Sequence, residues 1–233
     1  MKLGILQCDH VPDELVGKHG DYNQFFIDLL ADERLEFITF PVVDGIFPED
    51  PNAADGWVIT GGRSSVSDPD DWIARLKQFV RDAYRANAPM LGVCFGHQLI
   101  ATALGGVVGK SRAGMTAGPV EYQRADTQTG HVALTWHEEE VISLPDSARV
   151  VGASESCDYA ILRYGDTVLS YQGHPEIKPD FLIDLLAVMG DRLPGAAREN
   201  VLRSNHYQPS TSAFAHEIKE LFLDGKTVKT AAC

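Results

Sequence analysis

Short apolar runs alternate with amphipathic stretches through the N-terminal part of the chain. Four of the runs are bounded by polar or turn-forming residues, as buried strands are, and they cover residues 2–7, 35–40, 56–60 and 89–93. Between the first two, residues 21–31 carry phenylalanine and leucine at helical spacing. Strands that alternate with helices favour a largely parallel sheet with helices on both faces. The pattern therefore predicts an α/β fold.

Two more helices are expected around the fourth strand. Asp68 and Pro69 predict an N-cap and a first helical position, and apolar residues then recur with a 3.6-residue period up to Tyr84. After the strand, residues 95–104 predict a helix that ends at Gly105. The first of these is the clearest amphipathic helix of the chain.

The pattern changes beyond residue 107. Short β-prone runs separated by polar turns cover residues 132–136, 149–153 and 159–163, and we expect them as antiparallel strands added to the main sheet. A strand over 168–172 precedes a helix that begins at Pro179, and a last helix is predicted over 216–223. No repeat or linker divides the chain. We therefore expect a single domain over residues 1–233, with a mostly parallel central sheet flanked by helices and extended by antiparallel strands.

Composition and charge narrow the classes of function. Hydrophobic residues make up 44% of the 233 residues and charged residues 23%, as in ordinary globular proteins. The net charge of −13 opposes the phosphate field of nucleic acid, so nucleic-acid binding is disfavoured. No apolar run reaches the ~18 residues that a membrane span needs. The N-terminus turns polar after six residues and resembles no secretory signal, so we expect a cytoplasmic protein.

The four cysteines are scattered through the chain. Cys8, Cys94, Cys157 and Cys233 form no close pair and lie at no zinc-ligand spacing, which predicts reduced thiols, no metal site and no cofactor. Cys94 alone stands in a distinctive context, because Gly92-Val93-Cys94-Phe95-Gly96 places it between a predicted strand and a predicted helix. An isolated cysteine is usually a small buried hydrophobe, but flanking glycines at this turn are typical of a nucleophile.

The stretch from Gly92 to Gln98 resembles the elbow of the class I glutamine amidotransferases, G-[IV]-C-x-G-x-Q. Their second signature, a strand followed by H-P-E, matches His174-Pro175-Glu176, and a paired glycine matches Gly61-Gly62. The chain is thus similar to the glutaminase domain of GMP synthase. The resemblance implies a flavodoxin-like sheet and a triad in which Cys94 attacks, His174 transfers protons and Glu176 orients His174.

Oxyanion and substrate groups follow from the same resemblance. The N–H of Phe95 and the N–H of Gly62 or Arg63 are expected to stabilise the oxyanion, although relatives often carry proline where Arg63 stands. Gln98 and His137 are expected to bind substrate. The family's S-H-x-D-x-V segment aligns with residues 136–141, where Trp136 replaces serine and Glu139 replaces aspartate. His97, so close to Cys94 in sequence, is expected to point away from the thiol and to play a supporting role.

The implied reaction is hydrolysis of the side-chain amide of glutamine through a γ-glutamyl thioester, with ammonia passed to a synthase. No acceptor domain is expected in this chain. The synthase that receives the ammonia would therefore be a separate protein. The alternative is a γ-glutamyl peptidase or hydrolase that acts on γ-glutamyl compounds and transfers no ammonia. Two other readings are disfavoured. A catalytically idle scaffolding subunit would not need the intact triad, and cysteine-dependent relatives that process aldehydes usually carry histidine where Phe95 stands.

Overall fold

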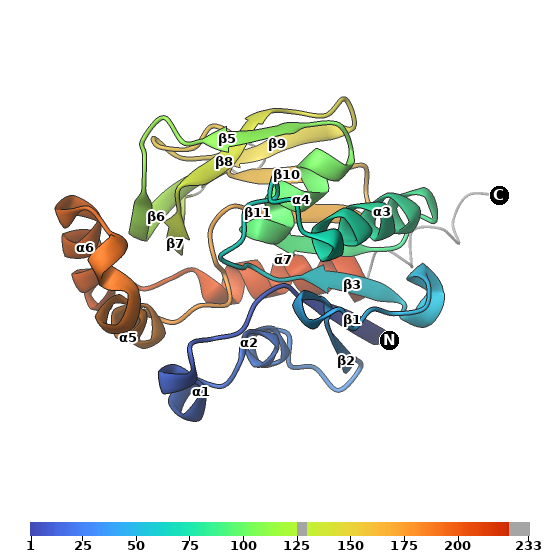
Figure 1. The fold of residues 1–233 in the computed structure, drawn as a ribbon, viewed down its shortest axis with the longest axis horizontal. Coiled ribbons are helices and arrows are strands. Elements are labelled where there is room, and N and C mark those ends of the chain that lie inside the picture. The colour runs from blue at the N-terminus through green and yellow to red at the C-terminus, as the bar shows by residue number, and fades with distance from the viewer. Residues whose placement is uncertain (125–129, 224–233) are drawn as a thin grey trace.

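The computed structural model describes residues 1–124 and 130–223, whose arrangement is shown in Figure 1. In chain order the strands are β1 (Lys2–Gln7), β2 (Glu36–Pro41), β3 (Gly56–Ile59), β4 (Met90–Val93), β5 (Val107–Lys110), β6 (Thr116–Arg124), β7 (Gly130–His137), β8 (Glu139–Ser143), β9 (Ala148–Ala153), β10 (Ile161–Tyr164) and β11 (Val168–Tyr171). The α-helices are α1 (Asp13–His19), α2 (Tyr22–Leu29), α3 (Asp71–Arg85), α4 (Phe95–Ala103), α5 (Pro179–Met189), α6 (Gly195–Leu202) and α7 (Thr211–Leu223).

Within the described residues, nine strands form one mixed sheet in the order β2-β1-β3-β4-β11-β10-β9-β6-β7. The first five pair in parallel, and each later pairing is antiparallel. Strands β5 and β8 form a small separate antiparallel pair. The predicted α/β class, with a parallel centre and added antiparallel strands, is confirmed.

Helices cover both faces of the parallel half because its strands are apolar on both sides, as parallel strands usually are. On one face, Phe26 of α2 and Phe222 of α7 pack with Val58 of β3. On the other, Leu76 of α3 and Ile100 of α4 pack with neighbouring side chains of the same strands. These two layers hold β3, β4 and β11 in the middle of the molecule (Figure 1).

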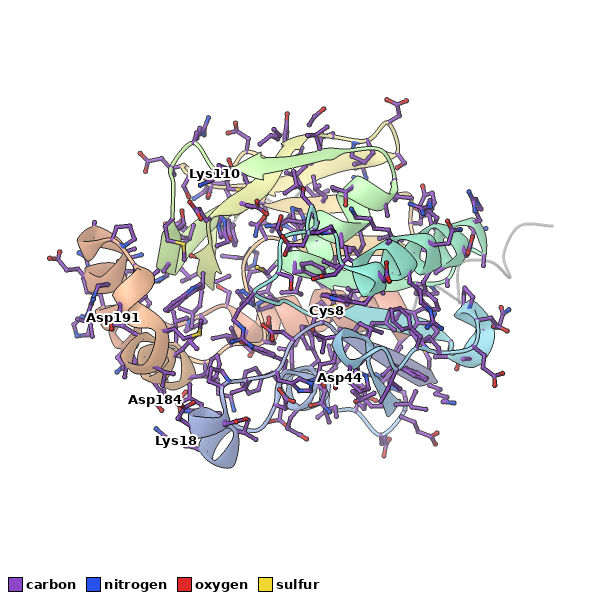
Figure 2. All side chains as sticks on the ribbon, in the orientation of Figure 1. Cys8, Lys18, Asp44, Lys110, Asp184 and Asp191 are labelled. Atoms are coloured by element: carbon purple, nitrogen blue, oxygen red, sulfur yellow. The ribbon has the colours of Figure 1, made fainter. Side chains whose placement is uncertain are left out.

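A third apolar cluster lies beside the sheet, between α1, α5, α6 and the β6–β7 hairpin. Leu15, Leu182 and Leu134 are buried in it. Helix α1 is also tied to α5 by an ion pair between Lys18 and Asp184 (Figure 2), in which Lys18 Nζ lies 2.5 Å from Asp184 Oδ2. His19 Nε2 lies 2.6 Å from the same oxygen. This cluster builds one side of the pocket described below.

Several elements differ from the sequence prediction. Helix α3 begins at Asp71 and not at Pro69, because Asp68 instead closes a turn with Ser65, whose N–H donates to Asp68 Oδ2 at 2.8 Å. Helices α1 and α6 and strands β5, β6 and β8 were not predicted. In β6, Gly118 adopts a φ of 100° and its Cα faces Asn200 of α6, where a Cβ would lie 2.6 Å from the amide nitrogen.

The remaining predicted elements are present with shifts of a few residues at their ends. Of the cysteines, Cys8, Cys94 and Cys157 are free thiols, and Cys233 lies outside the described residues. Among the helices of the described part of the chain, none combines the length and the apolar character needed to cross a bilayer.

Candidate active site

Three loops that carry the predicted site residues leave the same edge of the sheet. Gly61 follows β3, Cys94 follows β4 and His174 follows β11, and these three strands are parallel neighbours. The register pairs Val93 with Tyr171, so the elbow and the histidine loop begin side by side although they are eighty residues apart in sequence. The carboxyl ends of parallel strands are where ligand sites of α/β sheets form.

Cys94 occupies a strained backbone conformation. Its φ of 50° and ψ of −105° place it in a region that residues with a side chain rarely adopt. The flanking glycines permit this sharp turn by close packing: a Cβ on Gly92 would lie 2.6 Å from the Gly96 carbonyl oxygen, and a Cβ on Gly96 would lie 2.3 Å from that of Ile59. The turn holds the Cys94 side chain at the start of α4, where free N–H groups and the helix dipole stabilise negative charge.

His174 and Glu176 form a buried pair. His174 Nδ1 lies 2.7 Å from Glu176 Oε1, and their side chains are 8% and 1% exposed. The His174 backbone N–H donates to the carbonyl of Leu134, which ties the histidine loop to β7. Glu176 Oε2 has no hydrogen-bond partner among the described residues. The carboxylate therefore acts on the imidazole alone.

The imidazole of His174 also interacts with the thiol of Cys94, and both side chains lie against Gly61. Burial by itself lowers the pKa of His174, but the charges of Glu176 and Cys94 and the hydrogen bonds to both together raise that pKa to about 10. At neutral pH the ring is then an imidazolium beside the sulfur. Gly61 packs against this pair, since a Cβ there would lie 2.9 Å from His174 Cε1 and 3.5 Å from Cys94 Cβ.

Of the two backbone donors expected in the loop after β3, one is already engaged. The N–H of Arg63 donates to Asp9 Oδ2 at 2.9 Å, and its guanidinium makes two further bonds to the same carboxylate at 2.7 Å. Arg63 N–H is thus engaged, whereas Gly62 N–H has no partner among the described residues. Relatives often carry proline at this position, and proline has no N–H to donate. In this chain the bond from the Arg63 N–H to Asp9 holds the loop instead.

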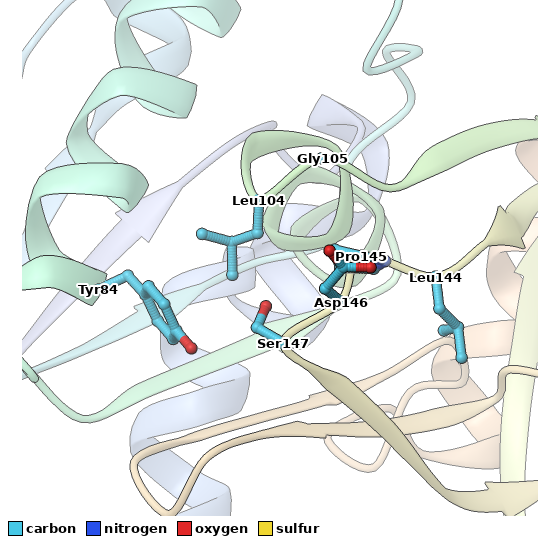
Figure 3. A pocket seen from close by; sticks show the side chains of 7 residues that line it. All are labelled: Tyr84, Leu104, Gly105, Leu144, Pro145, Asp146 and Ser147. Atoms are coloured by element: carbon cyan, nitrogen blue, oxygen red, sulfur yellow. The ribbon is translucent and has the colours of Figure 1, made fainter.

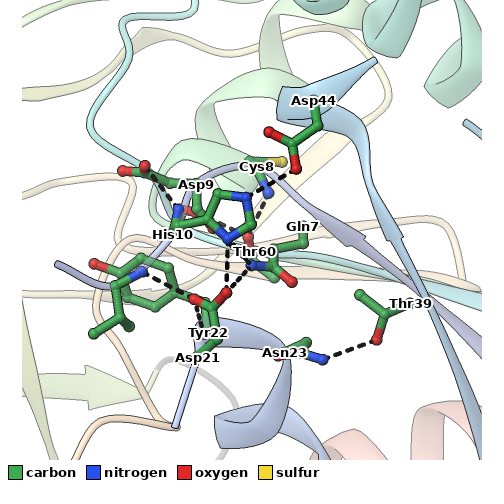
Figure 4. A network of polar contacts seen from close by, with 12 residues as sticks. Gln7, Cys8, Asp9, His10, Asp21, Tyr22, Asn23, Thr39, Asp44 and Thr60 are labelled. Atoms are coloured by element: carbon green, nitrogen blue, oxygen red, sulfur yellow. Dashed lines mark hydrogen bonds and ion pairs between the residues drawn. The ribbon is translucent and has the colours of Figure 1, made fainter. Parts of the chain in front are cut away.

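A polar network lies on the outer side of this loop, at the end of β1 (Figure 4). Asp21 accepts from the backbone N–H groups of Val11 and Tyr22 and contacts Gln7 Nε2 and His10 Nδ1, both at 2.7 Å. The hydrogen bond with Asp21 raises the pKa of His10. The network fixes the start of α2, whose first residue, Tyr22, lines the pocket.

Gln98 is buried behind the thiol, in a chain of amide contacts. Its Nε2 donates to the carbonyl of Glu139 at 2.7 Å and to Gln172 Oε1 at 3.2 Å, and Gln172 Nε2 lies 3.9 Å from Cys94 Sγ. His97 points the other way, as expected, with Nδ1 2.8 Å from the hydroxyl of Ser170. Burial lowers the pKa of His97 to about 3, so it remains neutral.

His137 and its neighbours form the opposite wall. His137 Nδ1 lies 3.1 Å from the carbonyl oxygen of Glu139, and burial, the largest influence, lowers its pKa to about 4. The neutral ring donates through Nδ1 and leaves Nε2 as an acceptor. The carboxylate of Glu139 accepts from the hydroxyl of Ser65 at 2.8 Å, which links this wall to the loop after β3.

These groups surround one pocket of about 400 Å³. It contains Cys94, His174, Gly62, Gln98 and His137 together, so the predicted side chains from distant parts of the sequence meet in one place; Glu176 lies behind His174. A second pocket, of about 380 Å³, lies between α3, α4 and the β8–β9 turn (Figure 3). Its lining of Tyr84, Leu104, Gly105, Leu144, Pro145, Asp146 and Ser147 includes no cysteine or histidine.

A family model described as "Glutamine amidotransferase class-I" matches residues 21–181. The chain belongs to the class I glutamine amidotransferase family. The match includes both the elbow at Cys94 and the segment that carries His174 and Glu176.

Relatives of this chain carry names that state different activities. The chain is 33% identical over 228 residues to gamma-glutamyl peptidase 2 of Arabidopsis thaliana, covering 89% of this chain and 90% of that protein. It is 30% identical over 132 residues to a probable GMP synthase of Leptospira interrogans, covering 52% of this chain and 21% of that protein. Among solved structures, a glutamine amidotransferase of Methylobacillus flagellatus has the same fold, with a TM-score of 0.75 and 20% identity over 97% of this chain and 94% of that one.

Within this amidotransferase fold, the sequence prediction missed three features of the pocket and its surroundings. Gln172 was expected only as a strand residue, although its position two residues before His174 places both on one side of an extended segment. Asp9 follows β1 and was expected only in a loop, yet it holds Arg63. The apolar side chains that line the pocket come from elements that were not predicted to meet, and no local motif marks them.

Proposed function

We propose that this chain hydrolyses the γ-glutamyl amide bond of γ-glutamyl compounds, with Cys94 as nucleophile, His174 as acid and base, and Glu176 as the carboxylate that orients His174. The contact between a strained Cys94 and a buried His174 paired with Glu176 is the observation that carries the proposal. Such a triad performs acyl transfer through a covalent intermediate.

In the acylation half, the Cys94 sulfur attacks the γ-carbonyl carbon and a C–S bond forms. The negative charge moves to the carbonyl oxygen, where the N–H groups of Phe95 and Gly62 are the proposed donors. The intermediate collapses as the imidazolium of His174 gives its proton to the amide nitrogen. The C–N bond breaks, the amine leaves, and a γ-glutamyl thioester remains on Cys94.

In the deacylation half, water replaces the amine beside His174. The neutral imidazole takes a proton from the water, whose oxygen attacks the thioester carbonyl. The C–S bond then breaks, glutamate is released, and the sulfur anion and the imidazolium are restored. Glu176 keeps one ring nitrogen fixed throughout, so the other nitrogen faces the reacting atoms in both halves.

The acyl half of the substrate needs groups that pair with an α-ammonium. Glu139 stands where the family motif has aspartate and lines the pocket beside His137 and Gln98. We propose that its carboxylate, with the carbonyl oxygen of the Gln98 amide, holds the γ-glutamyl group. Arg63 was the alternative to Gly62 as an oxyanion donor. Because its own N–H is bonded to Asp9, we assign it only the role of a structural anchor of this loop.

Similarity over most of the length to gamma-glutamyl peptidase 2 supports a γ-glutamyl compound as the substrate. A second candidate is the reaction implied by the family signature, hydrolysis of glutamine with transfer of ammonia to a separate synthase. The shorter match to a probable GMP synthase favours it. Both reactions use the same three residues and differ in the amine that leaves.

The test compares wild-type protein with Cys94→Ala. We expect the wild type to release glutamate from γ-glutamyl dipeptides faster than from glutamine, and to be labelled covalently by a glutamine-like electrophile. Both signals should vanish in Cys94→Ala. Full hydrolysis by that variant would rule out the mechanism, and a strong preference for glutamine, stimulated by a copurifying protein, would favour the amidotransferase.

Cys157→Ala is the matched control. Burial, the largest influence, raises the pKa of the Cys157 thiol to about 12, and burial also raises the pKa of Cys8. Both therefore stay protonated and unreactive at neutral pH. Cys157→Ala should keep activity and labelling, which shows that the loss in Cys94→Ala belongs to that sulfur and not to the removal of any buried thiol.

A further inference from the structure

The two walls of the active-site pocket differ in polarity. One is polar and comes from the loop after β3 and the β7–β8 turn, with Arg63, Ser65 and Glu139 among its side chains. The other, here called the apolar wall, consists of Met115, Trp136, Ile177, Leu185, Met189 and Leu193. Its residues come from β7, the residue before β6, the histidine loop, α5 and the turn after α5.

The apolar wall is part of the third core cluster. Ile177, Leu185 and Leu193 are buried in that cluster, while Met115, Trp136 and Met189 are half-buried and pack on it. The cluster thus fixes the positions of the wall, and the half-buried members present their remaining apolar surface to the pocket. Release of glutamine's ammonia makes no use of such a surface, because ammonia carries no apolar group.

The chemistry assigns each wall to one half of the substrate. The charged α-ammonium and α-carboxylate of a γ-glutamyl group would lose hydration against an apolar wall without compensation, so they belong at the polar wall. His174 must face the departing nitrogen in order to protonate it. Ile177 follows His174 in the same loop and leads into α5, so the apolar wall lies on the histidine side, where the amine departs.

Trp136 is the residue that makes this wall most unlike the family pattern. It stands at the serine position of the S-H-x-D-x-V segment, next to His137. Its indole joins the wall together with Met115, which directly precedes the partner strand β6. The departure from the motif therefore changes a small polar contact into a large apolar one at the edge of the pocket.

We propose that the apolar wall is the subsite for the amine half of the substrate, and that the preferred substrates are γ-glutamyl amides whose amine half carries a large aliphatic or aromatic side chain. This inference rests on the proposed hydrolysis of γ-glutamyl compounds and names their class. The reaction is unchanged: the C–N bond breaks, and the amine leaves with the proton from His174.

The experiment measures kcat/KM for dipeptides that share the acyl half: γ-glutamylglycine, γ-glutamylvaline, γ-glutamylleucine and γ-glutamylphenylalanine, with glutamine as reference. Each methylene buried in the transition state contributes a factor of about four. We expect kcat/KM to be at least about tenfold higher for γ-glutamylleucine than for γ-glutamylglycine, since burial on one wall is incomplete. Equal values for the two, or a preference for glutamine, would overturn the inference.

Variants then tie the preference to the wall. Met189→Ala and Trp136→Ser should each reduce the ratio of kcat/KM for γ-glutamylleucine to that for γ-glutamylglycine by about fivefold or more. Val188→Ala is the matched control for Met189→Ala, because Val188 is the preceding residue of α5, is 41% exposed and does not line the pocket. It should keep the wild-type ratio. Trp136→Ser removes a large side chain and could prevent folding. In that case Met189→Ala alone still decides the test.

The outcomes separate this inference from the proposed function. Hydrolysis that depends on Cys94 but shows the same ratio in wild type and Met189→Ala would leave the hydrolase and remove the subsite. Absence of any Cys94-dependent hydrolysis of γ-glutamyl compounds would remove both.

Discussion

Gly61→Ala tests the geometry of the site with a single added methyl group. The backbone of Gly61 lies outside the left-handed region, so alanine introduces no backbone strain there. The new Cβ would instead lie 2.9 Å from His174 Cε1 and 3.5 Å from Cys94 Cβ. Carbon atoms pack at about 3.5–4.0 Å, so the imidazole must move by roughly 0.6–1.1 Å.

A movement of this size should act mainly on the chemical step. Displacement of a reacting group by about 1 Å can lower a rate by about 10²-fold, so we expect kcat to fall about 10- to 100-fold while KM changes by less than about threefold. Overpacking typically costs about 1–3 kcal/mol of stability, which lowers Tm by about 2–12 °C for a chain of this size. The variant should therefore remain folded at room temperature.

The assay is release of glutamate from a γ-glutamyl dipeptide, with Tm measured on the same samples. Gly17→Ala is the matched control, because a Cβ at Gly17, inside α1, has nothing within 4 Å. It should leave kcat unchanged and raise stability by about 0.5–1 kcal/mol through helix propensity. Wild-type kcat in Gly61→Ala would refute the reasoning, since His174 would then not stand against Gly61 or would not be needed.

Three further substitutions probe the groups around the triad. Glu176→Gln should lower kcat by about 10²–10⁴-fold. Because Glu176 helps to raise the pKa of His174, the variant should lose its imidazolium, and with it activity, at a lower pH than the wild type. An unchanged decline of the rate at high pH would contradict this. Asp9→Asn should release Arg63 and lower kcat by about tenfold with little change in KM, measured in the same glutamate assay. A fall in kcat together with a higher KM and a lower Tm would instead indicate general unfolding. Glu217→Gln removes a carboxylate that pairs with the buried Arg124 and the half-buried Arg163, and it should lower the free energy of unfolding by about 3 kcal/mol in denaturant titration without changing kcat. Hydrogen bonds hold the pKa of Glu217 below its usual value despite burial, so wild-type stability should fall with acid as Glu217 protonates, and the variant should lack that loss.

The sequence predicts the parallel half of the fold well because its strands are buried on both faces. β3 and β4 are unbroken apolar runs and β1 is apolar from Leu3 to Leu6, and such runs can be recognised without knowledge of their neighbours. The antiparallel half is harder to predict. β6 contains Gly118 and Pro119, which normally interrupt strands, yet it pairs without a break with β7, and Asn200 of α6 packs over the glycine and donates to the carbonyl of Ala117.

That Cys94, His174 and Glu176 lie close together could be predicted for a related reason. Cys94 directly follows β4, and His174 and Glu176 stand in the loop after β11, so the order of these parallel strands already determines which loops meet. Side chains held by a partner far away in sequence carried no such signal. Asp9 gives no hint that Arg63, 54 residues later, will bind it, and Trp136 gives no hint that Met189 will line the same pocket.

The catalytic residues cannot separate the two candidate functions, but the apolar side chains around them can. An amidotransferase and a γ-glutamyl hydrolase form the same thioester on the same sulfur, so Cys94, His174 and Glu176 would be arranged alike in both. The reactions part where the amine leaves, because ammonia needs no apolar contact and a substituted amine gains from one. Specificity therefore has to be sought on the histidine side of the pocket, where Trp136 and the wall beside it, rather than the triad, set the size and polarity of the group that can depart.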